Sequence, residues 1–193
     1  MTDPTRPPRD RMVYAAAQLV REQGVAATGV RDVVDRAQAP RGSFQHYFPG
    51  GKTQLVDEAL DLAAGFAADW VTAYRAGTRS PTPAGLFAHL AGYWRHDLES
   101  RDFGRGCPIV ATVAETGAVD PAVTAAARRG LDRWQQAVVD ELRSQGLTAA
   151  RSRRLAVLML STLEGAIVLS RAQRSTRPLT TVVGALGPLL DAG

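Results

Sequence analysis

The sequence contains a single cysteine, Cys107, and a single lysine, Lys52, among its 193 residues. One cysteine cannot form a disulfide within the chain or a metal site built from several thiolates, so a reducing cellular compartment is expected. Long apolar runs are also lacking: the most apolar stretch, residues 155–169, is shorter than the roughly 20 residues that span a bilayer and contains Glu164. The first 11 residues carry three prolines and no apolar segment, which argues against a secretion signal. Together these absences predict a cytoplasmic protein that does not enter the membrane.

Strands are not indicated either, because strict alternation of apolar and polar residues is absent over any useful length. Apolar residues instead recur at helical spacing along nearly the whole chain, and 45% hydrophobic with 22% charged residues is typical of a soluble globular protein. We therefore predict an all-α fold. Gly24 is expected to end the first helix with a positive φ, and Thr28 to cap the second. The predicted helices cover approximately residues 9–24, 28–37, 41–48, 52–74, 84–98, 109–115, 121–145, 148–171 and 178–190.

Positive charge is concentrated at the beginning of the chain. Residues 1–52 carry eight Lys and Arg side chains against five Asp and Glu, whereas the remaining residues carry fifteen against fourteen. A basic N-terminal quarter favours a polyanionic partner such as a nucleic acid. Because the excess of positive charge is small, this inference also requires a nucleic-acid-binding motif in the same segment.

Such a motif lies in residues 28–47, where a helix, a tight turn and a second, very short helix have the outline of a helix-turn-helix. Phe44 and Phe48 are four residues apart, so both are expected to anchor the short helix on a core. The other side chains then face outward: Arg41, Ser43, Gln45, His46 and Tyr47. None is acidic, and in a major groove Arg can pair with guanine and Gln with adenine, while Gly42 permits a close backbone approach. The alternative is a short helix with an ordinary solvated surface.

Two segments around this motif resemble the TetR family of transcriptional repressors. Residues 24–33, GVAATGVRDV, resemble its junction between the first two helices, and residues 41–52, RGSFQHYFPGGK, resemble its recognition helix and the entry to the fourth helix. The Pro-Gly-Gly-Lys run at 49–52 and Gly-Cys-Pro at 106–108 are similar to the LmrA/YxaF-like subgroup. The resemblance implies a nine-helix TetR-like fold, with a DNA-binding head and N-terminal arm in residues 1–51 and a ligand-binding and dimerisation domain in residues 52–193.

The resemblance also implies which residues contact double-stranded DNA. Three match positions that contact phosphates, and their hydroxyl, phenol and ammonium groups can all meet a phosphate oxygen: Thr28, Tyr47 and Lys52. Five match the side that faces the bases: Arg41, Gly42, Ser43, Gln45 and His46. Gln45 departs from the aromatic residue usual in the family, which bears on the DNA sequence that is read. The arginines of the arm, Arg6, Arg9 and Arg11, either add contacts or belong to a solvated tail.

The last two predicted helices are apolar over more than one face, which indicates burial on two sides. One side is expected to meet the subunit core and the other a twofold-related copy. The resemblance implies a four-helix dimer interface, for which the candidates are Leu158, Leu163, Ile167, Val182 and Leu186. Two alternatives remain open: a buried core helix in a monomer, and a helical module that binds another protein.

Large aromatic residues between the head and these helices either pack in the core or line a cavity for a small apolar ligand. The resemblance implies an aromatic, flavonoid-like or drug-like effector that releases a repressor from a palindromic operator. The pocket candidates, including polar groups that would orient the ligand, are Phe66, Trp70, His89, Tyr93, Trp94, Cys107, Glu115, Trp134 and Glu164.

Enzymatic activity is not indicated by any pattern in the sequence. A nucleophile elbow, a Walker motif and a dinucleotide-binding glycine motif are absent, and no base can be assigned to Cys107 as a nucleophile. His89 and His96 are seven residues apart, which does not form a chelating pair. We therefore expect no catalytic residue, no metal site and no cofactor.

Overall fold

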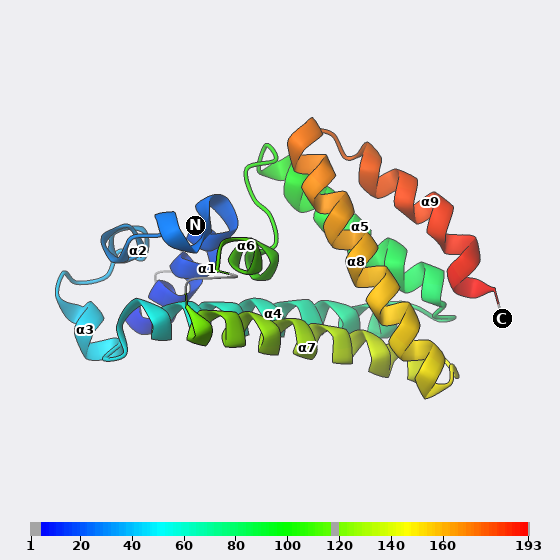
Figure 1. The fold of residues 1–193 in the computed structure, drawn as a ribbon, viewed down its shortest axis with the longest axis horizontal. Coiled ribbons are helices and arrows are strands. Elements are labelled where there is room, and N and C mark those ends of the chain that lie inside the picture. The colour runs from blue at the N-terminus through cyan, green and yellow to red at the C-terminus, as the bar shows by residue number, and fades with distance from the viewer. Residues whose placement is uncertain (1–4, 117–119, 193) are drawn as a thin grey trace. The chain divides into compact units, whose positions relative to one another are not determined.

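The computed structural model describes residues 5–116 and 120–192, and over these residues the fold consists of nine α-helices without a strand (Figure 1). The all-α prediction is confirmed. The helices are α1 (Pro8–Ala27), α2 (Val30–Arg36), α3 (Ser43–Tyr47), α4 (Gly51–Gly77), α5 (Pro83–Ser100), α6 (Pro108–Thr116), α7 (Pro121–Ser144), α8 (Ala149–Gln173) and α9 (Arg177–Asp191).

The helices are divided between two compact units. The first unit comprises residues 1–64 and 107–131, and therefore contains α1 to α3, the beginning of α4, all of α6 and the beginning of α7. The second unit comprises residues 65–106 and 132–193, and contains the remainder of α4 and α7 together with α5, α8 and α9. The first unit is thus larger than the predicted head of residues 1–51 and is built from two separate stretches of the chain.

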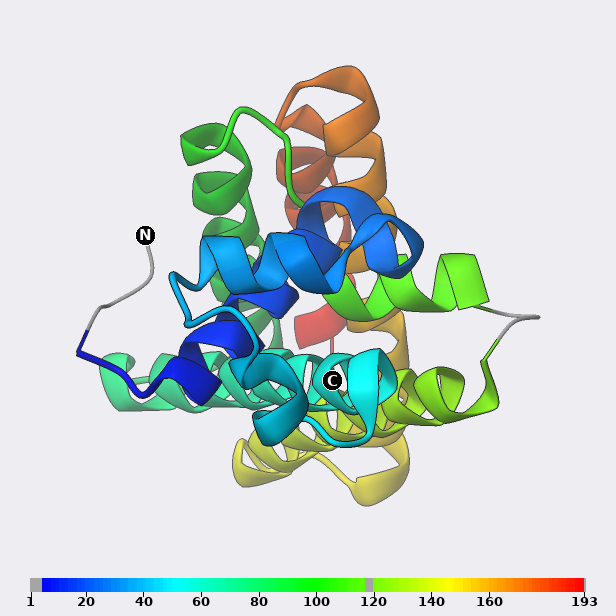
Figure 2. The same cartoon turned by 90° about the vertical axis from the view of Figure 1, so that its left-hand side faces the viewer.

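One apolar core of the first unit holds α1, α2, α3 and the beginning of α4 together. It joins Met12 and Leu19 of α1, Val33 of α2, Phe48 after α3, and Leu55 of α4, all nearly or fully buried. Because a helix of five residues cannot persist alone, α3 depends on this core for its position. Figure 2 looks onto α2 and α3, coloured blue to cyan.

The Phe anchors of α3 behave as predicted. Phe48 is fully buried, and Phe44 packs against the same core with its ring centroid 5.3 Å from that of Phe48. The helix itself is shorter than the predicted 41–48. Gly42 adopts a left-handed φ of 91°, which interrupts the helical pattern immediately before Ser43.

The junction between α1 and α2 differs from the prediction in one respect. Gly24 has the expected positive φ, 81°, but α1 resumes after it and ends at Ala27. Thr28 is not the N-cap of α2, because Gly29 occupies that position. The Thr28 side chain is only 2% exposed, and its hydroxyl donates a 2.6 Å hydrogen bond backward to the Gly24 carbonyl. The break at Gly24 leaves that carbonyl available, so Thr28 closes α1 instead of opening α2.

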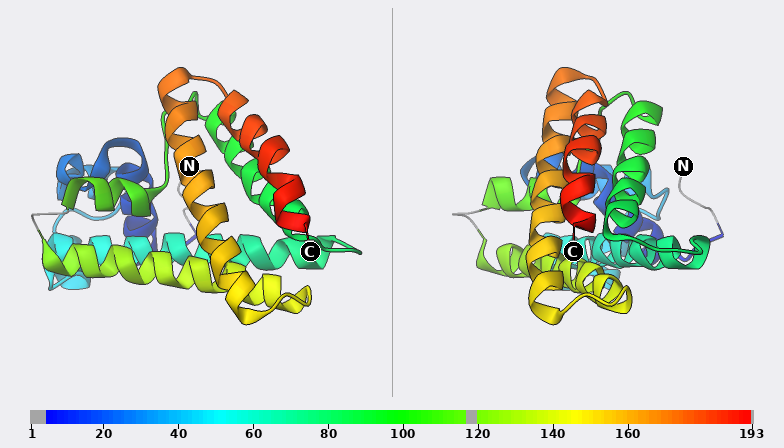
Figure 3. Two further views of the ribbon diagram at one scale, coloured as in Figure 1. Left: turned by 45° about the vertical axis from the view of Figure 1, so that its right-hand side comes forward. Right: turned by 90° about the vertical axis from the view of Figure 1, so that its right-hand side faces the viewer.

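In the second unit, α9 lies alongside α5 and α8 (Figure 3). The starts of two of these helices are capped, since the Thr82 hydroxyl accepts from the Gly85 N–H at 3.0 Å and the Thr148 hydroxyl from the Arg151 N–H at 3.3 Å. By length and composition alone, α8 is apolar enough to cross a membrane. Its inner side packs in the core of the unit, with Met159, Leu163 and Ile167 buried, whereas several apolar residues of its outer side are exposed.

Candidate nucleic-acid interface

The turn before α3 and the outer side of α3 form an exposed polar surface. Arg41, Gly42, Gln45 and His46 are exposed, as the sequence predicts for residues that face the bases. Ser43 is half-buried, and its hydroxyl donates a 2.7 Å hydrogen bond to the Pro40 carbonyl. The guanidinium, amide and imidazole groups of this surface can donate to base edges, and no acidic side chain lies among them.

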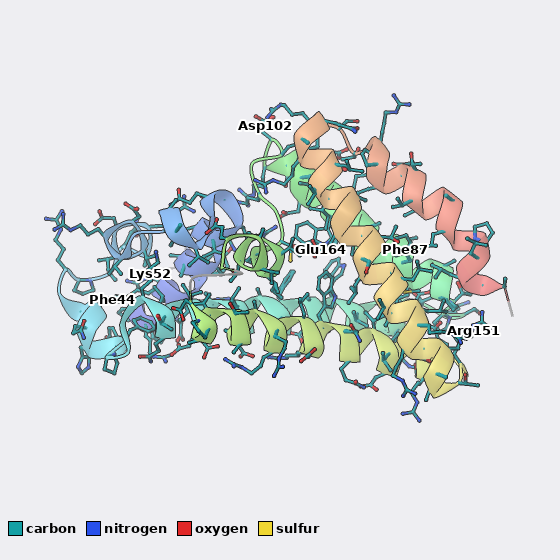
Figure 4. All side chains as sticks on the ribbon, viewed as in Figure 1. Phe44, Lys52, Phe87, Asp102, Arg151 and Glu164 are labelled. Carbon is teal, nitrogen blue, oxygen red and sulfur yellow. The ribbon has the colours of Figure 1, made fainter. Side chains whose placement is uncertain are left out.

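The three candidate phosphate contacts have different surroundings. Lys52 lies half-buried at the start of α4 (Figure 4), and its Nζ donates to the Ala26 carbonyl at 3.4 Å. Tyr47 is half-buried and packs against the core of the first unit. Thr28 is buried and its hydroxyl is already bonded, so a phosphate would reach it only after a local rearrangement. Lys52 is therefore the strongest candidate of the three.

Two of the three arginines near the N-terminus, Arg9 and Arg11, bond to other parts of the head, whereas Arg6 is exposed. Arg9 donates to Glu58 of α4 at 2.7 Å. Arg11 donates to two carbonyls at the end of α2, those of Ala37 at 2.8 Å and Gln38 at 2.9 Å. These bonds satisfy carbonyls that a helix end leaves without partners. The periodicity of α1 gives no signal for this role, because the acceptors lie far away along the chain.

Two predicted pocket residues belong to the first unit and have other surroundings. Cys107 is buried directly before α6. Glu115 of α6 accepts a 2.8 Å hydrogen bond from the Ala26 N–H at the end of α1. Apolar neighbours in the sequence do not reveal the unit to which a residue belongs, so the sequence alone could not separate these two residues from the aromatic residues of the second unit.

The other aromatic candidates do come together, on α4 and α5 of the second unit. The Trp70 ring stacks on His89 with a centroid distance of 5.0 Å and meets Tyr93 at the same distance. Phe66 lies 5.4 Å from Tyr93 and remains half-exposed. The His89 Nε2 lies 3.2 Å from the Trp70 carbonyl, so its N–H donates to that oxygen. Spacing of four residues on each helix places these rings on facing sides.

Trp94 and Trp134 are buried in the same unit, and Glu164 is half-buried on α8 (Figure 4). The indole N–H groups of Trp70 and Trp134 are buried without a hydrogen-bond acceptor among the described residues. Buried indole N–H groups are usually bonded, because desolvating a donor without a partner is unfavourable. The aromatic cluster therefore contains one such donor, the Trp70 N–H, and α7 carries a second in the same unit, the Trp134 N–H.

The predicted dimer residues divide between the core and the surface. Leu163, Ile167 and Leu186 are buried within the second unit, because they lie on the inner sides of α8 and α9, which helical periodicity does not distinguish from the outer sides. Val182 is half-buried and Leu158 is 41% exposed. The outer sides of α8 and α9 carry further exposed apolar residues beyond the predicted interface candidates: Val157, Val168, Leu169 and Leu189. On α8 these side chains recur at helical spacing, with exposed Ser161 and Gly165 between them.

Two family models match the chain. The model described as bacterial regulatory proteins, tetR family, matches residues 13–59, and the model described as transcriptional regulator LmrA/YxaF-like, C-terminal domain, matches residues 83–185. The first match contains the helix-turn-helix, and the second covers more than half of the chain.

Whole-chain comparisons give the same result. An HTH-type transcriptional regulator of Mycobacterium tuberculosis is 41% identical over 190 residues, which cover 96% of this chain and 95% of the relative. The HTH-type transcriptional regulator LmrA of Bacillus subtilis is 25% identical, with 94% and 96% covered. A crystal structure of regulatory protein TetR from Rhodobacter sphaeroides shares the fold with a TM-score of 0.81 at 22% identity, over 94% of this chain and 97% of that one. The chain thus belongs to the TetR family of DNA-binding transcriptional regulators, with an LmrA/YxaF-like C-terminal domain.

Proposed function

We propose that this regulator is a cytoplasmic repressor that binds a palindromic operator as a homodimer and is released by a small aromatic effector. The observation that carries the proposal is the exposed surface of Arg41, Gly42, Gln45 and His46, presented by α3 and the turn before it, which Phe44 and Phe48 fix to the core. A rigidly held set of hydrogen-bond donors without acidic neighbours suits the edges of bases in the major groove.

Dimerisation supplies the specificity that one short helix lacks. Two recognition helices read half-sites about 34–36 Å apart, or a multiple of that distance, so the operator repeats with the symmetry of the protein. The exposed apolar sides of α8 and α9, with Leu158, Leu169 and Leu189, support an interface there. Apolar side chains repeated at helical spacing, separated by small residues, allow the helices of two copies to pack closely.

The aromatic cluster of α4 and α5 supports a small aromatic effector. Such a ligand can stack on Trp70 and Tyr93 and place an acceptor against an indole N–H that is otherwise without a partner. Release of the operator requires the effector to favour the state that binds DNA weakly. By linkage, a 100-fold loss of operator affinity corresponds to about 2.7 kcal/mol of preference for that state.

The test is fluorescence anisotropy with duplexes that the wild-type protein selects from a random-sequence pool, followed by titration with flavonoids and aromatic drugs. We expect selection of an inverted repeat, nanomolar binding at moderate salt, and quenching of tryptophan emission by the compounds that release the DNA. Failure to enrich any sequence would contradict binding to a specific operator. Enrichment of a single site without an inverted repeat would contradict binding as a homodimer.

Substitution of Lys52 and of Gln45 with alanine is expected to have different effects on binding. Lys52→Ala should weaken binding to selected and unselected duplexes alike and reduce the salt slope by about 0.9 for each phosphate that is no longer neutralised. Gln45→Ala should leave the slope unchanged and relax the preference at one base pair, worth about 1–3 kcal/mol. Anisotropy titrations over a series of salt concentrations and sequences measure both quantities. Identical behaviour of the two variants would disprove the assignment of separate phosphate and base roles.

A further inference from the structure

The end of α1 contains a break in the helix at a buried residue. Gly24 has φ 81° and ψ 176°, so the backbone leaves the helical conformation there and returns to it for one more turn. A break of this kind takes the following N–H groups out of the regular pattern of helical hydrogen bonds. The Ala26 N–H is bonded instead to a side chain from another helix, the Oε2 of Glu115 on α6, at 2.8 Å.

The Glu115 carboxylate fills the space beside Gly24. A Cβ added at Gly24 would lie 1.4 Å from the Glu115 Oε1, far inside any permitted contact. The absence of a side chain at Gly24 therefore both permits the positive φ and admits the carboxylate. Gly24 and Glu115 form one interlocked feature of the first unit, although 91 positions separate them in the sequence.

The same short segment of backbone holds Lys52, the strongest candidate phosphate contact. The Lys52 Nζ donates to the Ala26 carbonyl at 3.4 Å, so Glu115 and Lys52 are bonded to the N–H and the carbonyl of one residue. On the other side of the segment, Thr28 closes it with its 2.6 Å bond to the Gly24 carbonyl.

We propose that Glu115 is a positioning residue for DNA binding: it fixes residues 24–28, and this segment in turn fixes the ammonium of Lys52 where it meets a phosphate. The proposal rests on the proposed phosphate contact of Lys52. A lysine side chain held by a rigid acceptor loses less conformational entropy on binding than a freely rotating one. Removal of the Glu115 acceptor frees the Ala26 peptide and, with it, the Lys52 side chain.

The test compares three variants on a duplex that the wild-type protein selects from a random pool. Glu115→Ala is expected to weaken binding roughly tenfold, as for removal of a hydrogen bond to a charged group, and to lower the salt slope. Glu115→Gln retains an oxygen that accepts from the Ala26 N–H, so its affinity and slope should remain near those of the wild type. Asp57→Ala is the matched control, since it removes an exposed carboxylate of the same unit that is paired with Arg129.

The change in net charge alone predicts that Glu115→Ala binds DNA more tightly, not more weakly. Loss of a carboxylate makes the protein more positive and by itself strengthens attraction to DNA. Asp57→Ala reports this general effect, so weaker binding of Glu115→Ala cannot come from charge alone. All titrations are made at a temperature where circular dichroism shows each variant folded, because the salt slope then reports contacts made by folded protein.

A double substitution separates this inference from the proposed role of Lys52. If Glu115 acts through Lys52, Glu115→Ala should change neither affinity nor slope further in a Lys52→Ala background. Additive effects, equal weakening by Glu115→Gln and Glu115→Ala, or wild-type binding of Glu115→Ala would overturn the positioning role and leave the phosphate contact intact. A Lys52→Ala variant with unchanged slope would overturn both.

Discussion

Replacement of Phe48 with alanine is expected to destabilise the first unit by about 3–5 kcal/mol and to abolish DNA binding. Phe48 is fully buried, and its ring contacts that of Phe44 and lies 5.4 Å from the Arg9 guanidinium carbon. The truncation leaves a cavity at the point where α3 is attached to α1 and α4. Because α3 has five residues and no stability of its own, it should lose its position even in molecules that remain folded elsewhere.

Chemical denaturation followed by two signals measures this effect. All three tryptophans, Trp70, Trp94 and Trp134, lie in the second unit, so their emission reports that unit, whereas far-UV circular dichroism reports helices in both. Leu62→Ala is the matched control, since Leu62 lies in the first unit like Phe48 but is 40% exposed. The Phe48 variant should lose helical signal at a lower denaturant concentration than this control. Coincident curves for the two variants would contradict the anchoring role of Phe48.

Introduction of aspartate at both Leu158 and Leu169 is expected to convert a dimer to monomers. These side chains are 41% and 52% exposed on the outer side of α8, so the substitutions should leave the core of the unit intact. In a twofold interface, they place four negative charges in an apolar environment, where burial of unpaired charge is strongly unfavourable. Loss of bivalent attachment should then weaken operator binding by on the order of 10²–10⁴-fold.

Light scattering after gel filtration measures the mass, and anisotropy measures the binding. A variant with aspartate at Ala73 and Ser80 is the control, because it adds the same charge at exposed positions of the second unit outside α8 and α9. A doubly substituted Leu158 and Leu169 variant that retains the mass of a dimer would place the interface elsewhere. A wild-type protein that is monomeric at all concentrations would refute the dimer itself.

Helix positions could be predicted well from the sequence because their signals are local. The predicted helix start near residue 121 is confirmed, with the Asp120 Oδ1 accepting from the Ala122 N–H at 2.9 Å, and Thr148 caps α8 close to its predicted start. The prediction was wrong at Thr28, where two adjacent residues can both begin a helix. The choice between Thr28 and Gly29 depends on the break at Gly24, because the Gly24 carbonyl accepts the hydrogen bond of the Thr28 hydroxyl.

The candidate site could be predicted only where exposure follows from helical spacing. Outward placement of Gln45 and His46 follows from the inward side chains of Phe44, which is half-buried, and Phe48, which is buried, because four-residue spacing defines the opposite side of the helix. The contact of Glu115 with Ala26 could not be predicted, since it joins residues distant in the sequence through one tertiary contact. On α8 both sides are apolar, so only the packing shows that Leu163 is internal and Leu158 external.

The discontinuity of the first unit governs how this regulator can be dissected or recombined. A fragment ending at residue 51 would lack Leu55 and Ala59, which complete its apolar core, and the α6 carboxylate that secures the end of α1. Chimeric regulators made by grafting residues 1–51 onto another effector domain would lack the same core residues and the same carboxylate contact. A transplanted head that keeps its own support must carry residues 1–64 and 107–131 together.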